Sequence, residues 1–267
     1  LNGSCFTDIN TGYIVGINGI ILKTTNAGNN WISLNSGTIR FLRAVFFVDY
    51  NIGYVAGDAG TILKTTNAGA NWTVQAGNDR ILKGNYFTDE NTGYSVGYEG
   101  TILKTTNKGS NWIRQNSGTL NNFNSVYFID QNTGYAVGDT GLIIKTTNAG
   151  VNWLQLSSGI KNNINSITFV GNSFGVAAAD SGKIDKTTNG GLICQAQRVL
   201  KDPDNLYSVD FLNINMGIVV GAGGRLSRTT NAGVSWTQQV IVGIGLNSID
   251  FADSLNCYIV GTNGRIY

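Results

Sequence analysis

The sequence predicts an all-β protein, a seven-bladed β-propeller of four-stranded antiparallel blades, and three observations lead there. The segment ILKTTNAGNNW at 21–31 recurs as ILKTTNAGANW, ILKTTNKGSNW and IIKTTNAGVNW, with decayed copies IDKTTNGGLIC and LSRTTNAGVSW. Its tryptophans lie 41, 40, 41 and then 83 residues apart, at Trp31, Trp72, Trp112, Trp153 and Trp236. Each period of about 41 residues holds four short runs rich in β-forming residues, which is the content of a propeller blade.

One repeat shows how the four strands are expected to follow each other. The run SVYFID at 125–130 alternates and predicts a first strand, and TGYAVG at 133–138 predicts a second. The intervening DQNTG predicts a turn, and GDTG at 138–141 predicts a tight hairpin whose glycine supplies a positive φ. LIIKTTN at 142–148 and VNWLQL at 151–156 complete the blade.

Two markers count seven repeats, and a third counts six. The first-strand phenylalanine stands at Phe6, Phe47, Phe87, Phe128, Phe169, Phe211 and Phe251. The hairpin glycine stands at Gly19, Gly60, Gly100, Gly141, Gly182, Gly224 and Gly264. The turn between third and fourth strands has six copies, because the sequence reaches Tyr267 inside the seventh third strand. We expect one domain over 1–267, with blades 1–41, 42–82, 83–122, 123–163, 164–205, 206–245 and an incomplete 246–267.

Neither eight blades nor an open array is excluded by the sequence, and we expect the native chain to extend at one or both ends. An unpaired strand edge in a closing ring would otherwise be a liability.

Composition restricts the function. The chain has 42% hydrophobic and 13% charged residues with net charge +2, which favours a globular protein and gives no general case for nucleic acid. We expect no membrane span, because no apolar run reaches about 18 residues. Histidine is absent, which removes the commonest general base and metal ligand, and we expect no cofactor and no metal.

The turn between the third and fourth strands carries a family resemblance. It is similar to the Asp-box, or bacterial neuraminidase repeat, Ser/Thr-x-Asp-x-Gly-x-x-Trp, with asparagine in place of aspartate. The matching residues are Asn26, Gly28, Trp31, Asn67, Gly69, Trp72, Asn107, Gly109, Trp112, Asn148, Gly150, Trp153, Asn231, Gly233 and Trp236. The flanking pattern resembles the propeller family of photosystem II assembly and stability factors and their bacterial relatives. That resemblance implies a propeller that holds protein partners.

The residues of this turn are expected to stabilise the fold. Asparagine is expected to accept a hydrogen bond from the backbone two residues on. Glycine takes the left-handed conformation, and tryptophan fills the space between neighbouring sheets. Cys194 replaces the tryptophan of the fifth copy and is interpreted as a small core residue.

Specificity is expected on the loops between blades, because they differ while the other rim repeats. Arg40, Phe41, Arg43, Arg80 and Lys83 lie in two adjacent loops and predict a basic and aromatic patch for an acidic protein segment or a glycan. The alternative is solvated loops whose long side chains cover apolar surface. Tyr207 is a separate candidate for partner binding in the longest such loop, where Asp202 and Asp204 flank Pro203, and the alternative there is simple turn chemistry.

Other polar groups have competing readings. Asp210 and Asp250, on first strands that should line the channel, are either contacts to water and backbone or the carboxylate pair of a glycosidase. A ring of one cation per blade is either solvated strand ends or an anion site; its members are Lys23, Lys64, Lys104, Lys145, Lys186 and Arg228.

Two further patterns are a repeated acidic turn and a pair of cysteines near the two ends of the sequence. The Asp-x-Asn-x-Gly segments at 8–12, 49–53, 89–93 and 130–134 lack the glutamate of a calcium loop and are assigned to Asx-turns. Cys5 and Cys257 lie in the first and last repeats and are free thiols or a closing disulfide.

The sequence therefore favours a non-catalytic, monomeric binding propeller that engages a protein or glycan through the loops between blades. The alternatives are a structural module of a larger secreted or cell-surface protein and a glycosidase. An extracellular, periplasmic or cell-surface location in a bacterium is expected.

Overall fold

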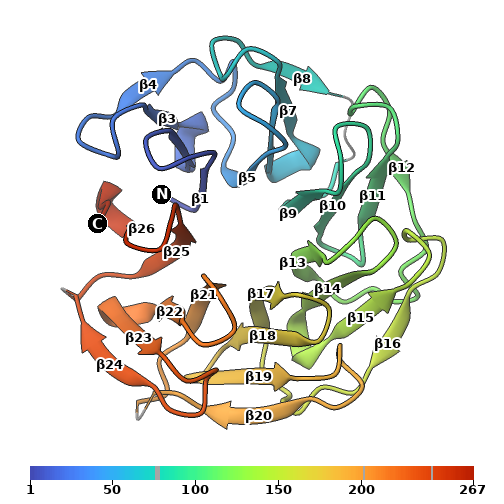
Figure 1. The fold of residues 1–267 in the computed structure, drawn as a ribbon. Coiled ribbons are helices and arrows are strands. Elements are labelled where there is room, and N and C mark those ends of the chain that lie inside the picture. The colour runs from blue at the N-terminus through green and yellow to red at the C-terminus, as the bar shows by residue number, and fades with distance from the viewer. Residues whose placement is uncertain (76–78, 201, 242) are drawn as a thin grey trace.

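A computed structural model describes residues 1–75, 79–200, 202–241 and 243–267. Within those residues the strands form six four-stranded sheets and one two-stranded sheet, set radially about a central channel (Figure 1). All pairings within the sheets are antiparallel between consecutive strands, for example β5-β6-β7-β8. The structure is therefore a propeller, as the repeat predicts.

Each blade runs from the channel outward. The innermost strands are β1 (Gly3–Phe6), β5 (Leu42–Phe47), β9 (Leu82–Phe87), β13 (Phe123–Phe128), β17 (Ile164–Val170), β21 (Leu206–Phe211) and β25 (Leu246–Phe251). The second strands are β2 (Gly12–Val15), β6 (Gly53–Gly57), β10 (Gly93–Gly97), β14 (Gly134–Gly138), β18 (Phe174–Ala179), β22 (Gly217–Gly221) and β26 (Cys257–Gly261).

Six blades continue to a third and a fourth strand. The third strands are β3 (Ile21–Thr24), β7 (Ile62–Thr65), β11 (Ile102–Thr105), β15 (Ile143–Thr146), β19 (Lys183–Thr187) and β23 (Arg225–Thr229). The outermost strands are β4 (Ile32–Leu34), β8 (Thr73–Gln75), β12 (Ile113–Arg114), β16 (Leu154–Leu156), β20 (Gln195–Arg198) and β24 (Thr237–Val240). Short 3-10 turns join second to third strands at η1 (Ile17–Gly19), η2 (Asp58–Gly60), η3 (Asp139–Gly141) and η4 (Ala222–Gly224), and η5 (Thr262–Gly264) follows β26 in the seventh unit.

The predicted count of seven four-stranded blades is wrong. The structure has six complete blades over the described residues, and the seventh repeat supplies only the hairpin β25–β26 with one further bridge, Val260 to Ile266. The phenylalanine and hairpin-glycine series overcount because both markers lie in the inner part of a blade. The turn before the fourth strand, with its six copies, marks the complete blades.

Glycine is required in the hairpins by space as well as by backbone conformation. At η1, Asn18 and Gly19 have φ of 56° and 70°. A Cβ on Gly19 would lie 1.8 Å from the Thr38 carbonyl oxygen, so only glycine lets the loop that leads to the next blade approach. The tight hairpin is therefore fixed by the neighbouring blade as well as by its own sequence.

Aromatic rings hold adjacent blades together. Tyr13 of β2 stacks on Phe47 of the next blade at 3.8 Å between ring centroids, and Trp72 meets Phe47 edge-on at 6.1 Å. The same stack joins the last blade to the first, where Tyr258 lies 3.8 Å from Phe6. Each such pair contributes about 0.5–1.5 kcal/mol beyond the area it buries.

The ring is closed by contacts between the hairpin β25–β26 and the first blade. The Asn247 side-chain amide donates to the Leu1 carbonyl at 2.7 Å, and the Phe6 N–H donates to Asp250 Oδ2 at 2.6 Å. The Ser4 and Ser248 hydroxyl groups lie 3.1 Å apart. These contacts rule out the alternative of an open array.

The loops lie on two opposite rims. On one, which we call the hairpin rim, the second-to-third-strand turns contact the loops between blades: the Asp58 N–H donates to the Phe41 carbonyl at 2.9 Å. On the other, the box rim, the first-to-second-strand turns contact the third-to-fourth-strand turns: the Ala68 N–H donates to the Asn51 carbonyl at 3.0 Å. This division agrees with the strand alternation.

Candidate functional site

A ring of inner-strand side chains surrounds the channel at the hairpin rim. In four blades this position is an asparagine whose amide donates to a first-strand or terminal carbonyl of the next blade, at 2.7–2.9 Å. These bonds run from Asn2 to Leu42, Asn124 to Ile164, Asn165 to Leu206 and Asn247 to Leu1. In the other three blades the equivalent residues are Arg43, Lys83 and Tyr207. Three of the predicted partner-binding residues therefore occupy a position that elsewhere joins blades.

Arg43 and Lys83 are already engaged within the protein. The Arg43 guanidinium forms a two-pronged ion pair with Asp58, in which Nη2 lies 3.1 Å from Oδ2. Lys83 Nζ donates to Asn124 Oδ1 at 2.8 Å and lies 5.2 Å from the centre of the Tyr98 ring. Burial, with a further contribution from nearby Arg43, lowers the Lys83 pKa.

The remaining cations of the predicted patch also have partners. Arg40 Nη1 donates to the Ala59 carbonyl at 2.7 Å, and Arg80 forms an ion pair with Glu99 at 2.8 Å. Phe41 remains 43% exposed between them. The structure therefore brings the residues of the two adjacent loops together, but as a mixed-charge surface and not as a field of unpaired positive charge.

Tyr207 belongs to the same ring but lies on β21, three blades beyond Lys83 on β9. Burial, followed by the charges of Asp180 and Asp204, raises its pKa. The acids beside Pro203 have a local role, because Asp202 and Asp204 both bind Arg225, the latter at 2.8 Å. The structure thus separates Tyr207 from the arginine-bearing loops.

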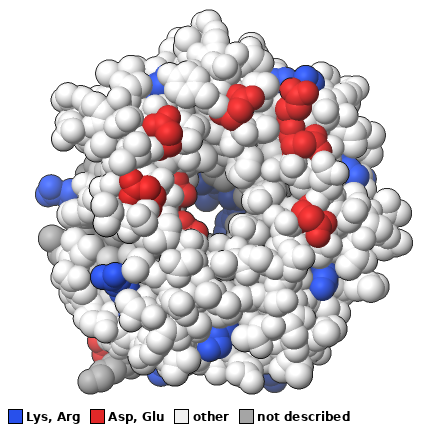
Figure 2. All heavy atoms as spheres, in the orientation of Figure 1, with Lys and Arg blue, Asp and Glu red and all other residues white. Residues whose placement is uncertain are grey.

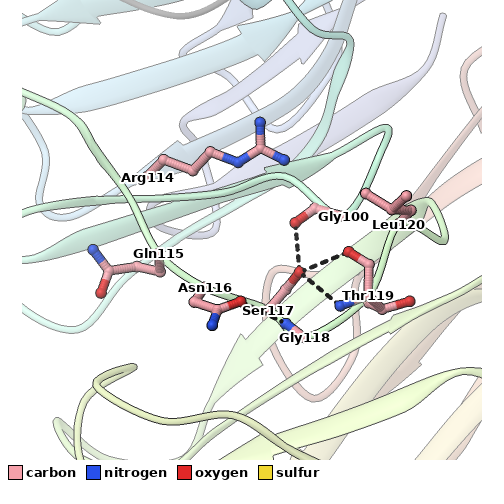
Figure 3. Close-up of a pocket in the computed structure, with 8 residues that line it drawn as sticks. All are labelled: Gly100, Arg114, Gln115, Asn116, Ser117, Gly118, Thr119 and Leu120. Carbon is pink, nitrogen blue, oxygen red and sulfur yellow. Dashed lines mark hydrogen bonds between the residues drawn. The ribbon is translucent and has the colours of Figure 1, made fainter.

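A shallow pocket on the same rim contains residues that the sequence reading did not single out. It has a volume of about 620 Å³ and is lined by residues 114–120 and Gly100. Figure 3 shows the Ser117 hydroxyl between Gly100 and Thr119; it donates to the Gly100 carbonyl at 2.8 Å. Leu120 is 80% exposed beside it, and Arg114 Nη2 donates to the Glu99 carbonyl. The variable loop sequence was the available signal for this site.

A second pocket of about 370 Å³ lies one blade earlier, next to Arg40. It also contains Gly37, Val74 and Asp79. Exposed Ile39, at 86%, belongs to the loop between these residues. The hairpin rim over the second and third blades therefore combines shallow pockets, exposed apolar side chains and guanidinium groups.

Asp210 and Asp250 join blades from within the channel wall. Asp210 Oδ2 accepts the Phe251 N–H at 3.0 Å, just as Asp250 accepts that of Phe6. Removal from water, and then the charge of Asp210, raises the pKa of Asp250 to about 8, and burial also raises that of Asp210. Both carboxyl groups thus serve the junctions on either side of the hairpin β25–β26.

Five of the six cations in the predicted ring bind the next blade, and the sixth, Arg228, lies with Nη2 3.8 Å from the Met216 sulfur of its own blade. Lys104 Nζ donates to the Ala149 carbonyl of the next blade at 2.7 Å, and Tyr94 donates to the same oxygen at 2.8 Å. Ala149 lies in the box-rim turn with φ of 54°, which aims its carbonyl at the preceding blade. The other lysines bind likewise, to Ala68, Lys108, Gly190 and Ala232. Neither solvated strand ends nor an anion site describes these lysines.

The asparagine of the repeated turn acts differently from the prediction. Asn26 Oδ1 accepts the N–H of Asn30, four residues on, at 2.9 Å, and not that of the residue two on. Thr24 Oγ1 accepts the N–H groups of Asn26 and Gly28. The backbone N–H groups of the turn are therefore satisfied by two side chains, the threonine at its start and the asparagine two residues later.

The fifth blade differs because Cys194 replaces tryptophan. A cavity of about 20 Å³ remains there, lined by Cys194, Phe169, Leu156 and Asp185 among others. Burial, and then the charge of Asp185, raises the Cys194 pKa to about 11. Cys194 packs against the apolar cluster between the fourth and fifth blades, as a small core residue would.

The Asp-x-Asn-x-Gly segments and the two terminal cysteines take the simpler of the forms considered for them. Asp8 Oδ1 accepts the N–H groups of Asn10 and Thr11, an Asx-turn, and no group of three metal-ligating side chains is found among the described residues. Cys5 and Cys257 are free and lie in different blade interfaces. None of the helices in the described ranges has the length and apolarity needed to cross a membrane.

Comparison with known proteins places these features in a family. The family model described as photosynthesis system II assembly factor YCF48 matches residues 3–85 and 73–202. The chain belongs to this family. A search of curated proteins finds no significant match.

Solved structures share the fold. A YCF48 bound to D1 peptide is 17% identical with a TM-score of 0.81, covering 98% of this chain and 89% of that one. YCF48 from Cyanidioschyzon merolae is 19% identical with a TM-score of 0.80, covering 100% and 94%. The GH74 enzyme of Niastella koreensis is 18% identical with a TM-score of 0.78, covering 100% of this chain and 51% of that enzyme.

Proposed function

We propose that this protein is a non-catalytic, monomeric propeller that holds a protein segment on the hairpin rim over its second and third blades. Membership of an assembly-factor family supports a binding role, and one YCF48 of the same fold is bound to a peptide. A glycan partner, and a location in the periplasm, outside the cell or on its surface, stay predictions.

The observation that carries the proposal is the exchange of asparagine for Arg43 and Lys83. Four blades keep the asparagine that donates to a carbonyl of the next blade. Arg43 gives up this bond and pairs with Asp58 of its own blade, whereas Lys83 exchanges it for a bond to the Asn124 side chain of the next blade. The new side chains bring charged groups to the inner strands of the two blades whose hairpin rim also carries exposed Phe41 and the two pockets. Such asymmetry within a repeated frame favours a binding surface.

The experiment restores the repeated residue instead of deleting side chains. Arg43→Asn with Lys83→Asn should keep the fold, since asparagine forms the interblade bond at this position elsewhere. We expect the double variant to retain its Tm but to lose partners that the parent captures from extracts of its source cells, as measured by quantitative mass spectrometry. Arg228→Asn, on the other rim, is the matched control. Equal capture by the parent and the double variant would refute the proposed surface.

A further inference from the structure

The box rim is asymmetric in charge. Figure 2 shows carboxylates gathered over one side of this rim, whereas its lower side, near β17–β24, shows red atoms only at the lower-left margin; basic atoms lie deeper in the central opening. The acids come from first-to-second-strand turns of five blades: Asp8, Asp49, Asp89 with Glu90, Asp130 and Asp253. The equivalent residues of the fifth and sixth blades are Gly171 and Asn213.

These acidic charges are not required by the turns that carry them. Asn213 Oδ1 accepts the N–H groups of Asn215 and Met216 at 3.0 Å, which is the pattern Asp49 forms with Asn51 and Ile52. Partial burial opposes ionisation of Asp8, but bonds from Asn10 and Thr11 outweigh it and lower the pKa. The pKa values of Asp130 and Asp253 are lowered as well, in Asp130 by N–H donors that outweigh burial and in Asp253 by the Asn256 side chain. Asp8, Asp130 and Asp253 therefore present charge in turns that an asparagine can also form.

The neutral side of the box rim exposes aliphatic side chains. At one position of the third-to-fourth-strand turn, the first three blades carry Asn29, Ala70 and Ser110. The next three carry Val151, Leu192 and Val234, which are 69%, 80% and 70% exposed. Because asparagine, alanine and serine form the same turn, the turn does not need these aliphatic groups.

Neighbouring turns extend the aliphatic region. Ile193, next to Leu192, is 62% exposed, and Ile214 of the sixth blade is 49% exposed. Leu255 of the seventh blade is 91% exposed and adjoins the acidic side at Asp253. Exposed apolar side chains gathered on consecutive units mark an interaction surface.

The cations of this rim do not create the asymmetry. The first five blades each carry one lysine here, and each ammonium binds a carbonyl of the next blade, as Lys145 binds that of Gly190 at 2.9 Å. Among the acids, Glu90 pairs with Lys108. For the described residues, Asp8, Asp49, Asp130 and Asp253 have no ion-pair partner within 4.0 Å.

We propose that the box rim docks an amphipathic segment of a partner protein, with apolar side chains on the Val151–Leu192–Val234 side and lysine or arginine on the acidic side. Charge complementarity selects this occupant, because the acidic half repels an anionic membrane surface and attracts a basic flank. The surface is opposite the hairpin rim, so this inference does not depend on the function proposed there.

The test uses a fluorescent 18-residue peptide of leucine and lysine arranged on opposite faces of a helix, titrated by anisotropy. Leu192→Ser with Val234→Ser removes the apolar side. Asp49→Asn with Asp130→Asn removes two charges and keeps both turns. We expect each double variant to bind the peptide about tenfold more weakly than the parent. In the aspartate double variant, the affinity should also depend less on salt concentration. Ile32→Ser, on the exposed strand β4, and Asp180→Asn, on the hairpin rim, should leave affinity within about twofold.

Four results would overturn the inference. The first is that the parent does not bind the peptide, and the second is that a scrambled peptide of the same composition binds equally well. The third is that neither the serine pair nor the asparagine pair of substitutions changes the affinity. The fourth is self-association of the parent that Leu192→Ser abolishes in sedimentation, which would assign the aliphatic side to a second copy of the chain. Circular dichroism of each variant confirms that the blades remain folded.

Discussion

Asp185 lies 4% exposed in the apolar interface between the fourth and fifth blades, at a position that the first four blades fill with Leu22, Leu63, Leu103 and Ile144. One carboxyl oxygen accepts the Gly159 N–H at 2.9 Å, and the buried Oδ1 has no hydrogen-bond partner. Burial raises the Asp185 pKa. A buried polar atom without a partner costs about 1–3 kcal/mol.

Replacing Asp185→Leu is therefore expected to raise the free energy of unfolding, by about 1–3 kcal/mol. Because the folded-state pKa is raised, Asp185 destabilises the parent increasingly as pH rises above the unfolded value near 4. The advantage of the variant should grow as pH rises above about 4 and become constant once Asp185 is ionised in the folded parent. Urea unfolding of both proteins at several pH values measures it, with Asp49→Asn as control. An advantage that shrinks with pH would contradict this reading of the carboxyl.

At the scale of elements, the strands and rims could be predicted but the contacts between blades could not. Alternation and turn residues report local conformation, so the strand order and the glycine hairpins follow from the sequence. We call the bonds from Lys104 and Tyr94 to the Ala149 carbonyl, and their equivalents in other blades, the lysine clamp. Lys104 and Ala149 are 45 residues apart, and nothing in the ILKTTN motif indicates that its lysine reaches the next copy of the motif. The ion pairs of Arg43 and Arg80 were hidden for the same reason.

The shared carbonyl of Ala149 permits a quantitative test of the clamp. Either Lys104→Met or Tyr94→Phe leaves one donor on that oxygen and should cost about 1 kcal/mol. The double variant leaves the carbonyl without a side-chain donor and should cost more than the sum of the two. Urea denaturation of the four proteins gives the coupling energy. Additive losses would show that the two donors act separately.

At the scale of the whole molecule, closure depends on the two-stranded seventh unit. The sequence indicated seven repeats, but it did not say which repeated residue marks a complete blade. That became clear from the structure, in which, among the described residues, β25 pairs with β26 in a sheet of two strands. The variation of the loops between blades was visible in the sequence and led to the proposed partner surface. Its charge balance was not visible, because the acids that pair with the arginines lie in different segments.

Asp250 gives this junction a pH dependence. Its pKa is raised from 3.8 to about 8, so the folded state binds the extra proton and stability falls as pH rises from about 4 to 8. Asp250→Asn keeps an acceptor for the Phe6 N–H and removes the charge. We expect faster hydrogen exchange in β1 and β25 at pH 8 than at pH 5 in the parent, after correction for intrinsic rates, and little difference in the variant. Asp253→Asn should behave as the parent, and equal pH sensitivity in the Asp250 variant would refute this account.

The lysine contact also has a direction, since each of the first five blades donates an ammonium to its successor and blades two to six each offer a carbonyl to their predecessor. A unit with both halves can be duplicated or deleted without redesigning its neighbours, as in any head-to-tail chain of identical couplings. Gene duplication could thus lengthen this ring by whole units. Individual units remain free to diverge on their outer turns.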